Sequence, residues 1–165
     1  MKGIMAGSFD PVSVGHLDII KRAASLVDKL DIAVSRNYSK SGLFTFEERC
    51  AMLEACTKSF ENVSVIAVDG LLTDQIEKDG YKAYFRGLRS TKDFEYELEL
   101  SQIYGHFLKD KCEVIYLMTD PAYSYISSST IRENYLLGAD VSEWVPEEAY
   151  KLMIGDFNKL KGETR

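Results

Sequence analysis

The residues best suited to chemistry in this chain follow its first apolar segment. Residues 4–6 are expected to form a buried strand, and the next ten, GSFDPVSVGH (7–16), combine glycines, Ser8, an Asp-Pro turn and His16 just before an amphipathic helix. Glycines let a backbone approach an anion, and a helix N-terminus supplies N–H groups and a positive dipole end. The pattern indicates a phosphate site at the carboxyl end of a first parallel strand. It is neither the GxGxxG fingerprint nor a GxxxxGK[ST] P-loop.

Two later segments favour the same chemistry. Arg86 and Arg89 flank Gly87-Leu88 directly after a predicted strand at 83–85, and arginine forks match phosphate oxygens; salt bridges to nearby acids are the alternative. Residues 127–130 (SSST) place four hydroxyls at a predicted helix start. One hydroxyl is enough for an N-cap, so the surplus favours an anion nest for a polyphosphate.

Lys40 and Glu97 are weaker candidates, because each segment by itself is typical of a solvated side chain. No Ser/His/Asp triad, metal-ligand cluster or paired-carboxylate site stands out in the sequence. Phosphoryl and nucleotidyl transfer depend mainly on positioning and charge stabilisation, so the lack of an obvious nucleophile or general base agrees with that class of reaction.

Strand and helix patterns alternate along the chain. Strands are predicted at 4–6, 31–35, 63–68, 83–85 and 113–118, and helices at 15–30, 45–57, 72–79, 91–108, 128–137 and from Pro146 onward. Five strands separated by helices predict an α/β fold with a doubly wound, five-stranded parallel sheet, Rossmann-like, in one domain over 1–165. On the helix 91–108, Phe94, Leu98 and Ile103 are expected to face inward.

Composition limits the function classes. The chain has 165 residues and a net charge of −6, which argues against broad nucleic-acid binding but leaves room for a basic pocket. No apolar run approaches the length of a membrane span, and no signal-peptide pattern is present. Three widely spaced cysteines without a CxxC pair suggest buried thiols in a reducing compartment. We therefore expect a cytoplasmic protein without membrane or nucleic-acid partners.

The motifs GSFDPVSVGH, LFTFEER, RGLR, DFEYE and ISSS, in this order and spacing, resemble the bacterial phosphopantetheine adenylyltransferases over essentially the whole chain. GxFDPxxxGH and ISSSxxR mark the wider nucleotidyltransferase superfamily, and RGLR with DFEYE narrows the resemblance. The chain departs from the family pattern in a few places. Ser8 stands where Thr is usual, Ser13 replaces the first histidine of the superfamily's HxGH, and Tyr104-Gly105 replaces an Asn and a basic residue.

The resemblance implies transfer of the adenylyl group of ATP to 4′-phosphopantetheine, giving 3′-dephospho-coenzyme A and pyrophosphate, with Mg²⁺. It also implies a homohexamer and coenzyme A as a feedback ligand. It makes His16 the catalytic residue that stabilises the transition state at the α-phosphate. The 4′-phosphopantetheine contacts it implies are Ser8, Lys40, Leu72 and Arg86. The ATP contacts it implies are Ser8, Phe9, His16, Gly87, Leu88, Arg89, Glu97, Tyr123, Ser124, Tyr125, Ile126, Ser127, Ser128 and Ser129.

Other functions remain open at this level. ISSSTIR (126–132) also resembles nicotinamide or nicotinate mononucleotide adenylyltransferases, although Ser13 and the RGLR segment argue against them. A glycerol-phosphate cytidylyltransferase is a weaker alternative. A non-catalytic nucleotide-binding regulator would keep the phosphate loops but leave His16 without a role. These functions differ in which acceptor, if any, supports the release of pyrophosphate from the nucleotide.

Overall fold

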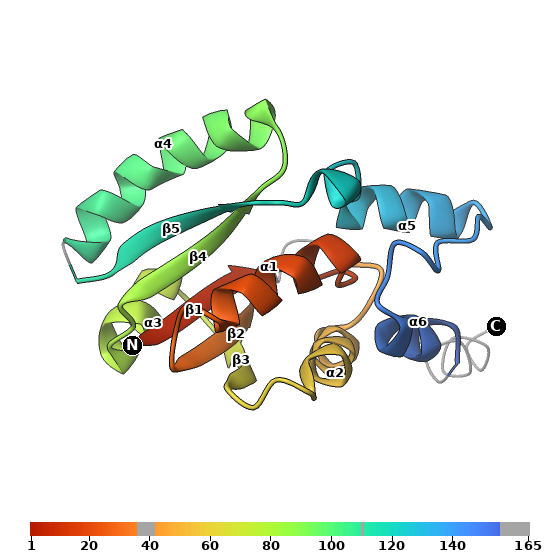
Figure 1. The fold of residues 1–165 in the computed structure, drawn as a ribbon, viewed down its shortest axis with the longest axis horizontal. Helices are drawn as coiled ribbons and strands as arrows, with labels where there is room; N and C mark the ends of the chain where they lie inside the picture. Colours follow the sequence, from red (N-terminus) through yellow and green to blue (C-terminus); the bar gives the residue numbers. More distant parts are fainter. Residues whose placement is uncertain (36–41, 110, 156–165) are drawn as a thin grey trace.

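A computed structural model describes residues 1–35, 42–109 and 111–155. Its five strands form one parallel sheet in the order β3-β2-β1-β4-β5 (Figure 1). This confirms the predicted doubly wound α/β fold. The elements are β1 (Lys2–Gly7), α1 (Val14–Ala24), β2 (Lys29–Ser35), α2 (Phe46–Thr57), β3 (Val63–Val68), α3 (Leu72–Asp79), β4 (Ala83–Leu88), α4 (Thr91–Leu108), β5 (Glu113–Met118), the 3-10 turn η1 (Pro121–Tyr123), α5 (Ser128–Leu136) and α6 (Glu147–Ile154).

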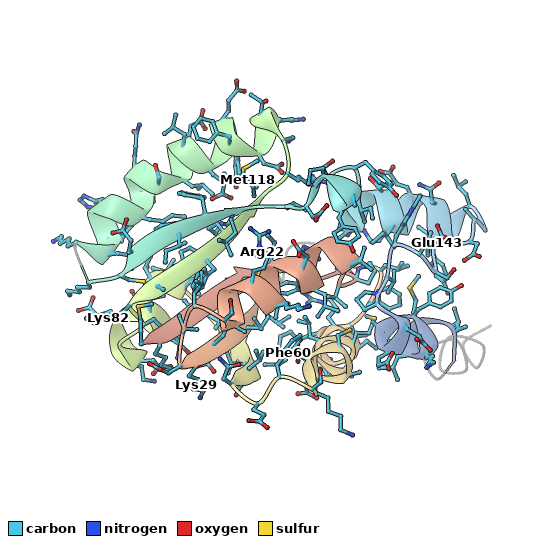
Figure 2. The ribbon with its side chains drawn as sticks, in the orientation of Figure 1. Arg22, Lys29, Phe60, Lys82, Met118 and Glu143 are labelled. Carbon is cyan, nitrogen blue, oxygen red and sulfur yellow. The ribbon has the colours of Figure 1, made fainter. Side chains whose placement is uncertain are left out.

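The two faces of the sheet carry separate cores. Successive strand residues point to opposite faces, so Ile4 joins one core and Met5 the other. The larger core lies beneath α1, α2, α5 and α6, and the smaller one beneath α3 and α4. On the larger side, Arg22 of α1 donates from Nη1 to the Met118 carbonyl at 2.6 Å (both labelled in Figure 2), which ties this helix to the carboxyl end of β5.

Helix α1 is shorter than predicted, ending at Ala24 rather than at residue 30. The side-chain amide of Asn62 donates to the carbonyls of Ala24 and Val27 at 2.8 and 3.0 Å, which holds the chain in a turn. From Lys29 the backbone pairs with β1 instead of continuing the helix. These long-range bonds override the local helical pattern.

Strand β4 is longer than predicted, because residues 86–88 continue it instead of forming a loop. They pair with β5 as far as Leu88–Met118. Toward β1 the pairing of β4 stops at Phe85 opposite Met5. Since β1 lies between β2 and β4 while the crossovers leave in opposite directions, the ends of β1 and β4 diverge at the topological switch point, where ligands bind in this class of sheet.

The predicted inward face of α4 is wrong. Phe94, Leu98 and Ile103 are 51%, 52% and 50% exposed. The helix buries Glu97 and Leu108 instead. Glu97 pairs with Arg86 of β4, and this contact fixes the rotation of α4 about its axis. Apolar residues occur on several sides of α4, so their spacing alone did not identify the buried face. Within the described residues, neither α4 nor any other helix is long and apolar enough to cross a membrane.

Candidate active site

A cavity of about 580 Å³ opens where β1 and β4 diverge. Its volume falls in the range of small-molecule sites. The walls come from the β1–α1 loop, the N-termini of α1, α4 and α5, the end of β4 and Arg49 of α2. Ten predicted site residues line it: Ser8, Phe9, His16, Arg86, Gly87, Arg89, Ile126, Ser127, Ser128 and Ser129.

The other predicted residues do not line this cavity. Leu88 and Tyr125 adjoin wall residues in the chain, Tyr123 and Ser124 lie in the segment that leads to Ile126, Leu72 begins α3, and Glu97 lies on α4. Tyr125 is 63% exposed and packs edge-on against Trp144. Lys40 lies outside the described residues. The roles of all seven in binding stay predictions.

The β1–α1 loop turns sharply at Phe9, whose φ of 48° lies in the left-handed region. The Phe9 ring is 1% exposed, and it meets the His16 ring edge-on at a centroid distance of 5.1 Å. The ring also lies close to Gly7, where an added Cβ would come within 3.1 Å of it. Burial of the ring therefore holds an unfavourable backbone conformation, which places His16 beside the strand end.

His16 is oriented by Ser13, the N-cap of α1. The Ser13 backbone N–H donates to Nδ1 of His16 at 3.1 Å, and the Ser13 hydroxyl accepts from the His16 N–H at 3.2 Å, forming a reciprocal capping box. An Nδ1 that accepts leaves the proton of the neutral ring on Nε2. Burial, reinforced by the nearby Arg89 charge, lowers the pKa of His16 to about 4. At neutral pH His16 is therefore a neutral Nε2–H donor on the cavity wall.

The two helix N-termini at the cavity differ in their backbone N–H groups. In α1, Val14 N donates to Trp144 O and His16 N to Ser13, so in the first turn only the Gly15 N–H has no partner among the described residues. In α5, the Ser127 side chain accepts from Thr130 N, whereas the N–H groups of residues 128 and 129 have no partner among the described residues. The α5 N-terminus is therefore the better anion site of the two.

The serines at 127–129 make contacts within the fold as well as lining the cavity. The Ser128 hydroxyl donates to the Pro11 carbonyl at 2.8 Å, which ties α5 to the β1–α1 loop. Arg132 strengthens that tie through a 2.6 Å bond from its Nη1 to the Asp10 carbonyl. Asp10 in turn accepts from the N–H groups of Leu43 and Phe44 at 3.0 and 2.9 Å. The loop thus holds both α5 and the segment that leads into α2.

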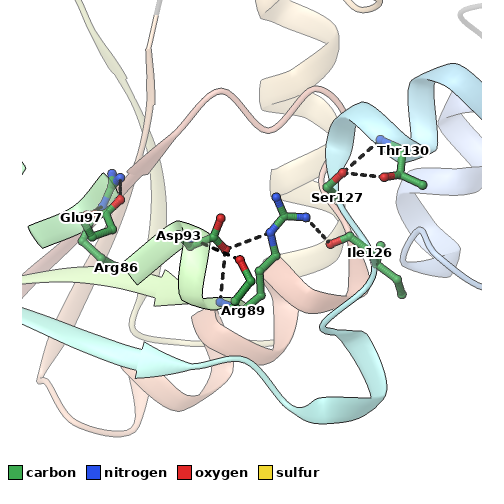
Figure 3. A network of polar contacts seen from close by, with 8 residues as sticks. Arg86, Arg89, Asp93, Glu97, Ile126, Ser127 and Thr130 are labelled. Carbon is green, nitrogen blue, oxygen red and sulfur yellow. Dashed lines mark hydrogen bonds and ion pairs between the residues drawn. The ribbon is translucent and has the colours of Figure 1, made fainter. Parts of the chain in front are cut away.

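The side chains of Arg86, within β4, and Arg89, directly after it, point in different directions (Figure 3). Arg86 grips Glu97 through both Nε and Nη2 and donates to the Tyr84 hydroxyl at 2.7 Å. The Glu97 carboxylate and the Tyr84 hydroxyl raise the pKa of Arg86 further above its already high value, against the effect of burial. Glu97, predicted as an ATP contact, acts here as the residue that orients Arg86.

Arg89 extends toward α5. Its Nε donates to Asp93 at 3.0 Å and its Nη1 to the Ile126 carbonyl at 3.3 Å (Figure 3). Since the side chain is 39% exposed, its pairing with Asp93 is weak and the guanidinium keeps freedom to reach a phosphate. Arg89 and the α5 N-terminus thus meet at one end of the cavity.

Sequence reasoning gave no site role to Ser13 and Arg49, which both line the cavity. Ser13 was noted only as a departure from a motif, yet Ser-x-x-His at the start of a helix has the spacing of a capping box. Arg49 lies within LFTFEER and is 8% exposed beside the cavity. Nothing in the local pattern around Arg49 indicates a site, because an arginine three residues into a helix is usually solvated.

No group of three or more His, Cys, Asp or Glu side chains in the described part of the chain has the geometry of a metal site. The cavity carboxylates, Asp10 and Asp93, already accept hydrogen bonds. Mg²⁺ often binds through one or two carboxylates, waters and substrate phosphates rather than a protein cage. This donor set fits an Mg²⁺ that arrives with a nucleotide.

Comparison with known proteins agrees with this geometry. The sequence pattern of the cytidylyltransferase-like family matches residues 4–134. The chain is 44% identical over 161 residues to the phosphopantetheine adenylyltransferase of Lachnoclostridium phytofermentans, covering 98% of both chains. It is 44% identical over 158 residues to that of Staphylococcus carnosus, covering 96% of this chain and 98% of the relative. It is 39% identical over 161 residues to that of Clostridium perfringens, again covering 98% of both.

Proposed function

Because the chain belongs to the phosphopantetheine adenylyltransferase family, we propose that it transfers the adenylyl group of ATP to 4′-phosphopantetheine, forming 3′-dephospho-coenzyme A and pyrophosphate. One observation carries the proposal. A single cavity joins a neutral Nε2–H donor at His16, the Arg89 guanidinium and the two unpartnered N–H groups at the start of α5. Such an arrangement suits a triphosphate next to a second anion.

The reaction is a direct in-line displacement. An oxygen of the acceptor phosphate forms a bond to the α-phosphorus of ATP while the bond from that phosphorus to the α–β bridging oxygen breaks, and the electron pair leaves with pyrophosphate. The acceptor phosphate is already an anion near pH 7, so the site requires no strong base. Arg86, held rigid by Glu97 and Tyr84, directs the acceptor phosphate toward the α-phosphorus.

His16 acts at the α-phosphate, where negative charge builds up on the oxygens in the transition state. Because Nδ1 is occupied by the Ser13 N–H, the ring of this cavity-lining residue keeps its proton on Nε2 throughout the reaction. A preorganised neutral donor stabilises the developing charge without first having to shed hydration. The unpartnered Gly15 N–H lies at the same helix start and adds to this effect.

Arg89 and the α5 N-terminus bind the β- and γ-phosphates and stabilise the leaving pyrophosphate. When bound, Mg²⁺ neutralises charge on these same phosphates. Asp93, in the first turn of α4, pairs with Arg89 only weakly, so the guanidinium can turn toward these phosphates. The sequence-derived contacts at Leu88, Glu97 and Tyr123–Tyr125 would then concern the adenosine half of ATP, which needs more room than the phosphate end of the cavity.

A pyrophosphate-release assay with different acceptors tests the proposal. With ATP, release should depend on 4′-phosphopantetheine and should not occur with nicotinamide mononucleotide. CTP with glycerol 3-phosphate should also give none. Binding of ATP without release for any acceptor would instead support a nucleotide-binding regulator.

We also propose that the enzyme assembles as a homohexamer. Exposed apolar residues of α4 lie on two flanks of the helix, Phe94 and Leu98 on one and Tyr96, Ile103 and Phe107 on the other, each about half exposed; exposed apolar surface of this kind is usually covered. Coenzyme A contains the pantetheine arm and the adenosine of the product, so it would compete for the same cavity as a feedback ligand.

A cytoplasmic location agrees with the cysteine chemistry. Burial raises the pKa of Cys56 to about 12 and that of Cys112 to about 11. Both thiols therefore stay protonated and unreactive at neutral pH. Their side chains act as small hydrophobic groups, which is how thiols are used in a reducing compartment.

A further inference from the structure

Four arginines line the cavity, and three of them lie beside a carboxylate of the chain itself. The pairs are Arg86 with Glu97, Arg89 with Asp93, and Arg132 with Asp10 at 3.7 Å. Arg49 is the fourth, and no carboxylate among the described residues lies within ion-pair distance of it. The cavity wall therefore holds one arginine whose charge nothing in the described chain neutralises.

Arg49 is anchored through one side of its guanidinium. Nη1 donates to the Ser8 carbonyl at 2.5 Å and lies 3.4 Å from the Ser35 carbonyl, so the group bridges the ends of β1 and β2. The guanidinium also lies over the Phe46 ring, 5.7 Å from its centroid. These contacts fix the position of a cation that is only 8% exposed.

The other edge of the Arg49 guanidinium is unused. Nε is buried and has no hydrogen-bond partner, and Nη2 makes no hydrogen bond within the described residues. Nε and Nη2 together form the fork through which Arg86 grips Glu97. A buried donor without a partner is costly, and an arginine fork fits carboxylate or phosphate oxygens. The free Nε–Nη2 edge is therefore suited to bind an anion that is not part of the chain.

We propose that Arg49 is an additional substrate-binding residue, whose Nε–Nη2 edge receives the phosphate of 4′-phosphopantetheine. The inference rests on the proposed function and deepens it by adding a cation to the acceptor site. Arg86 brings no net charge to that site, because Glu97 already neutralises it. An acceptor phosphate carrying close to two negative charges needs a further cation, and Arg49 supplies it.

The position of Arg49 favours the acceptor over ATP. Arg89 and the α5 N-terminus, which suit the triphosphate, gather beyond the end of β4. Arg49 lies on the opposite side, at the ends of β1 and β2, and holds the Ser8 carbonyl. Asp10 of the same loop fixes the segment at Leu43 and Phe44 nearby. An anion held by Arg49 would therefore lie apart from the groups proposed to bind the leaving pyrophosphate.

The binding test compares Arg49→Met with wild type by calorimetric titration. Loss of a charge-assisted fork should weaken 4′-phosphopantetheine binding by about 10- to 100-fold. ATP and pantetheine without its phosphate should bind within about threefold of wild type, since neither uses this fork. Lys58→Met, which removes an exposed charge from the end of the same helix, is the matched control and should leave all three affinities unchanged.

A merely structural Arg49 gives a different pattern. A folded Arg49→Met variant that binds 4′-phosphopantetheine as wild type does, or that loses affinity for all three ligands equally, would overturn the inference. Arg49→Lys keeps the charge but lacks the guanidinium fork. It should therefore bind 4′-phosphopantetheine more tightly than Arg49→Met and more weakly than wild type.

A second measurement uses the wild-type protein and so does not depend on how the variant folds. In ¹⁵N-arginine-labelled protein, the Nε–H resonance of Arg49, assigned with Arg49→Lys, should shift on addition of 4′-phosphopantetheine and not on addition of pantetheine. Inorganic phosphate alone should move the same resonance. No response to phosphate would overturn the inference, whereas failure of wild type to bind 4′-phosphopantetheine would overturn the proposed function.

Discussion

The protonation state of His16 decides what this side chain can offer a nucleotide. An imidazolium would attract phosphates by charge, but the pKa of about 4 leaves the ring neutral over the physiological range. Its contribution is therefore directional, through the Nε2–H that the Ser13 capping box sets. Only the transition state, with more charge on the α-phosphate oxygens, gains strongly from such a donor.

We therefore expect His16→Ala to lower kcat by about 10²- to 10³-fold, as for the loss of other preorganised donors to a developing oxyanion. The KM for ATP should change by much less, because the β- and γ-phosphates are bound elsewhere. Steady-state pyrophosphate release measures both constants. His106→Ala, at an exposed position on α4, is the control and should behave as wild type.

His16 also gives stability a defined pH dependence. Its folded-state pKa lies below the ordinary value of 6.5, so its contribution is complete above pH 6.5. As pH falls from about 6.5 toward 4, His16 takes up a proton in the unfolded chain but stays neutral in the folded chain. This difference lowers the unfolding free energy by up to about 1.4 kcal/mol per pH unit. Urea denaturation at pH 7 and pH 5 measures this. The pH 7 to 5 loss should be smaller in His16→Gln than in wild type; equal losses would contradict the assignment.

At the scale of elements, the site depends on links between segments that are distant in the sequence. The cap pairs Thr45–Glu48 and Ser127–Thr130 and the left-handed glycines at 80 and 138 are local features, and the sequence predicted the helix ends that they define. The end of α1, the length of β4 and the rotation of α4 depend on Asn62, on β5 and on the Arg86–Glu97 pair. Local periodicity carries no information on such contacts, so these predictions failed.

The residues of the site also divide into those that local sequence patterns reveal and those that depend on contacts between distant segments. Motif residues on the strand-end loops could be found from the sequence, because the carboxyl ends of parallel strands must share one edge. Arg49 and the orienting role of Glu97 could not, since each acts across two elements brought together only by the fold.

The Arg86–Glu97 link gives a test at this scale. Glu97→Gln keeps the shape but removes the charge that orients the guanidinium. Loss of this orientation should outweigh the positive charge that the site gains, and should raise the KM for 4′-phosphopantetheine by about tenfold. The KM for ATP should rise less if Glu97 acts only through Arg86. Glu99→Gln, exposed on the same helix, is the control. A larger rise for ATP would instead support a direct nucleotide contact at Glu97.

Asp10 provides a second test, because it holds the segment entering α2 against the β1–α1 loop. Asp10→Asn leaves one side-chain oxygen for the two N–H groups of Leu43 and Phe44, which should lower the unfolding free energy by about 1–3 kcal/mol. Urea denaturation reports this loss. Asp140→Asn, at an exposed turn where Asp140 accepts from Ser142 N, should cost far less; equal losses would show that the Asp10 link is unimportant.

At the scale of the whole molecule, the two faces of the sheet are covered unequally. The α1 side has a large core closed by four helices, while α4 on the other side buries little besides Glu97 and Leu108. The flank of α4 that carries Ile103 and Phe107 is apolar, and Met118 on the edge strand β5 is 61% exposed. These are the surfaces that assembly would cover.

Charges placed on this flank should therefore break the assembly. Ile103→Lys combined with Phe107→Lys should shift the mass measured by light scattering from that of a hexamer to smaller species, because buried unpaired charges are strongly disfavoured at an interface. Leu137→Lys, at a residue that is 86% exposed, should leave the mass unchanged. An unchanged mass for the α4 double variant would contradict this interface.

Direct transfer within the single cavity is tested most directly by rapid-quench measurement of pyrophosphate with enzyme in excess over ATP. We predict one pyrophosphate per ATP when 4′-phosphopantetheine is present, none from ATP alone, and the same yield at a rate about 10²- to 10³-fold lower for His16→Ala. A burst of pyrophosphate from ATP alone would reveal a covalent adenylyl-enzyme, and an unchanged rate for His16→Ala would remove the residue on which the mechanism rests.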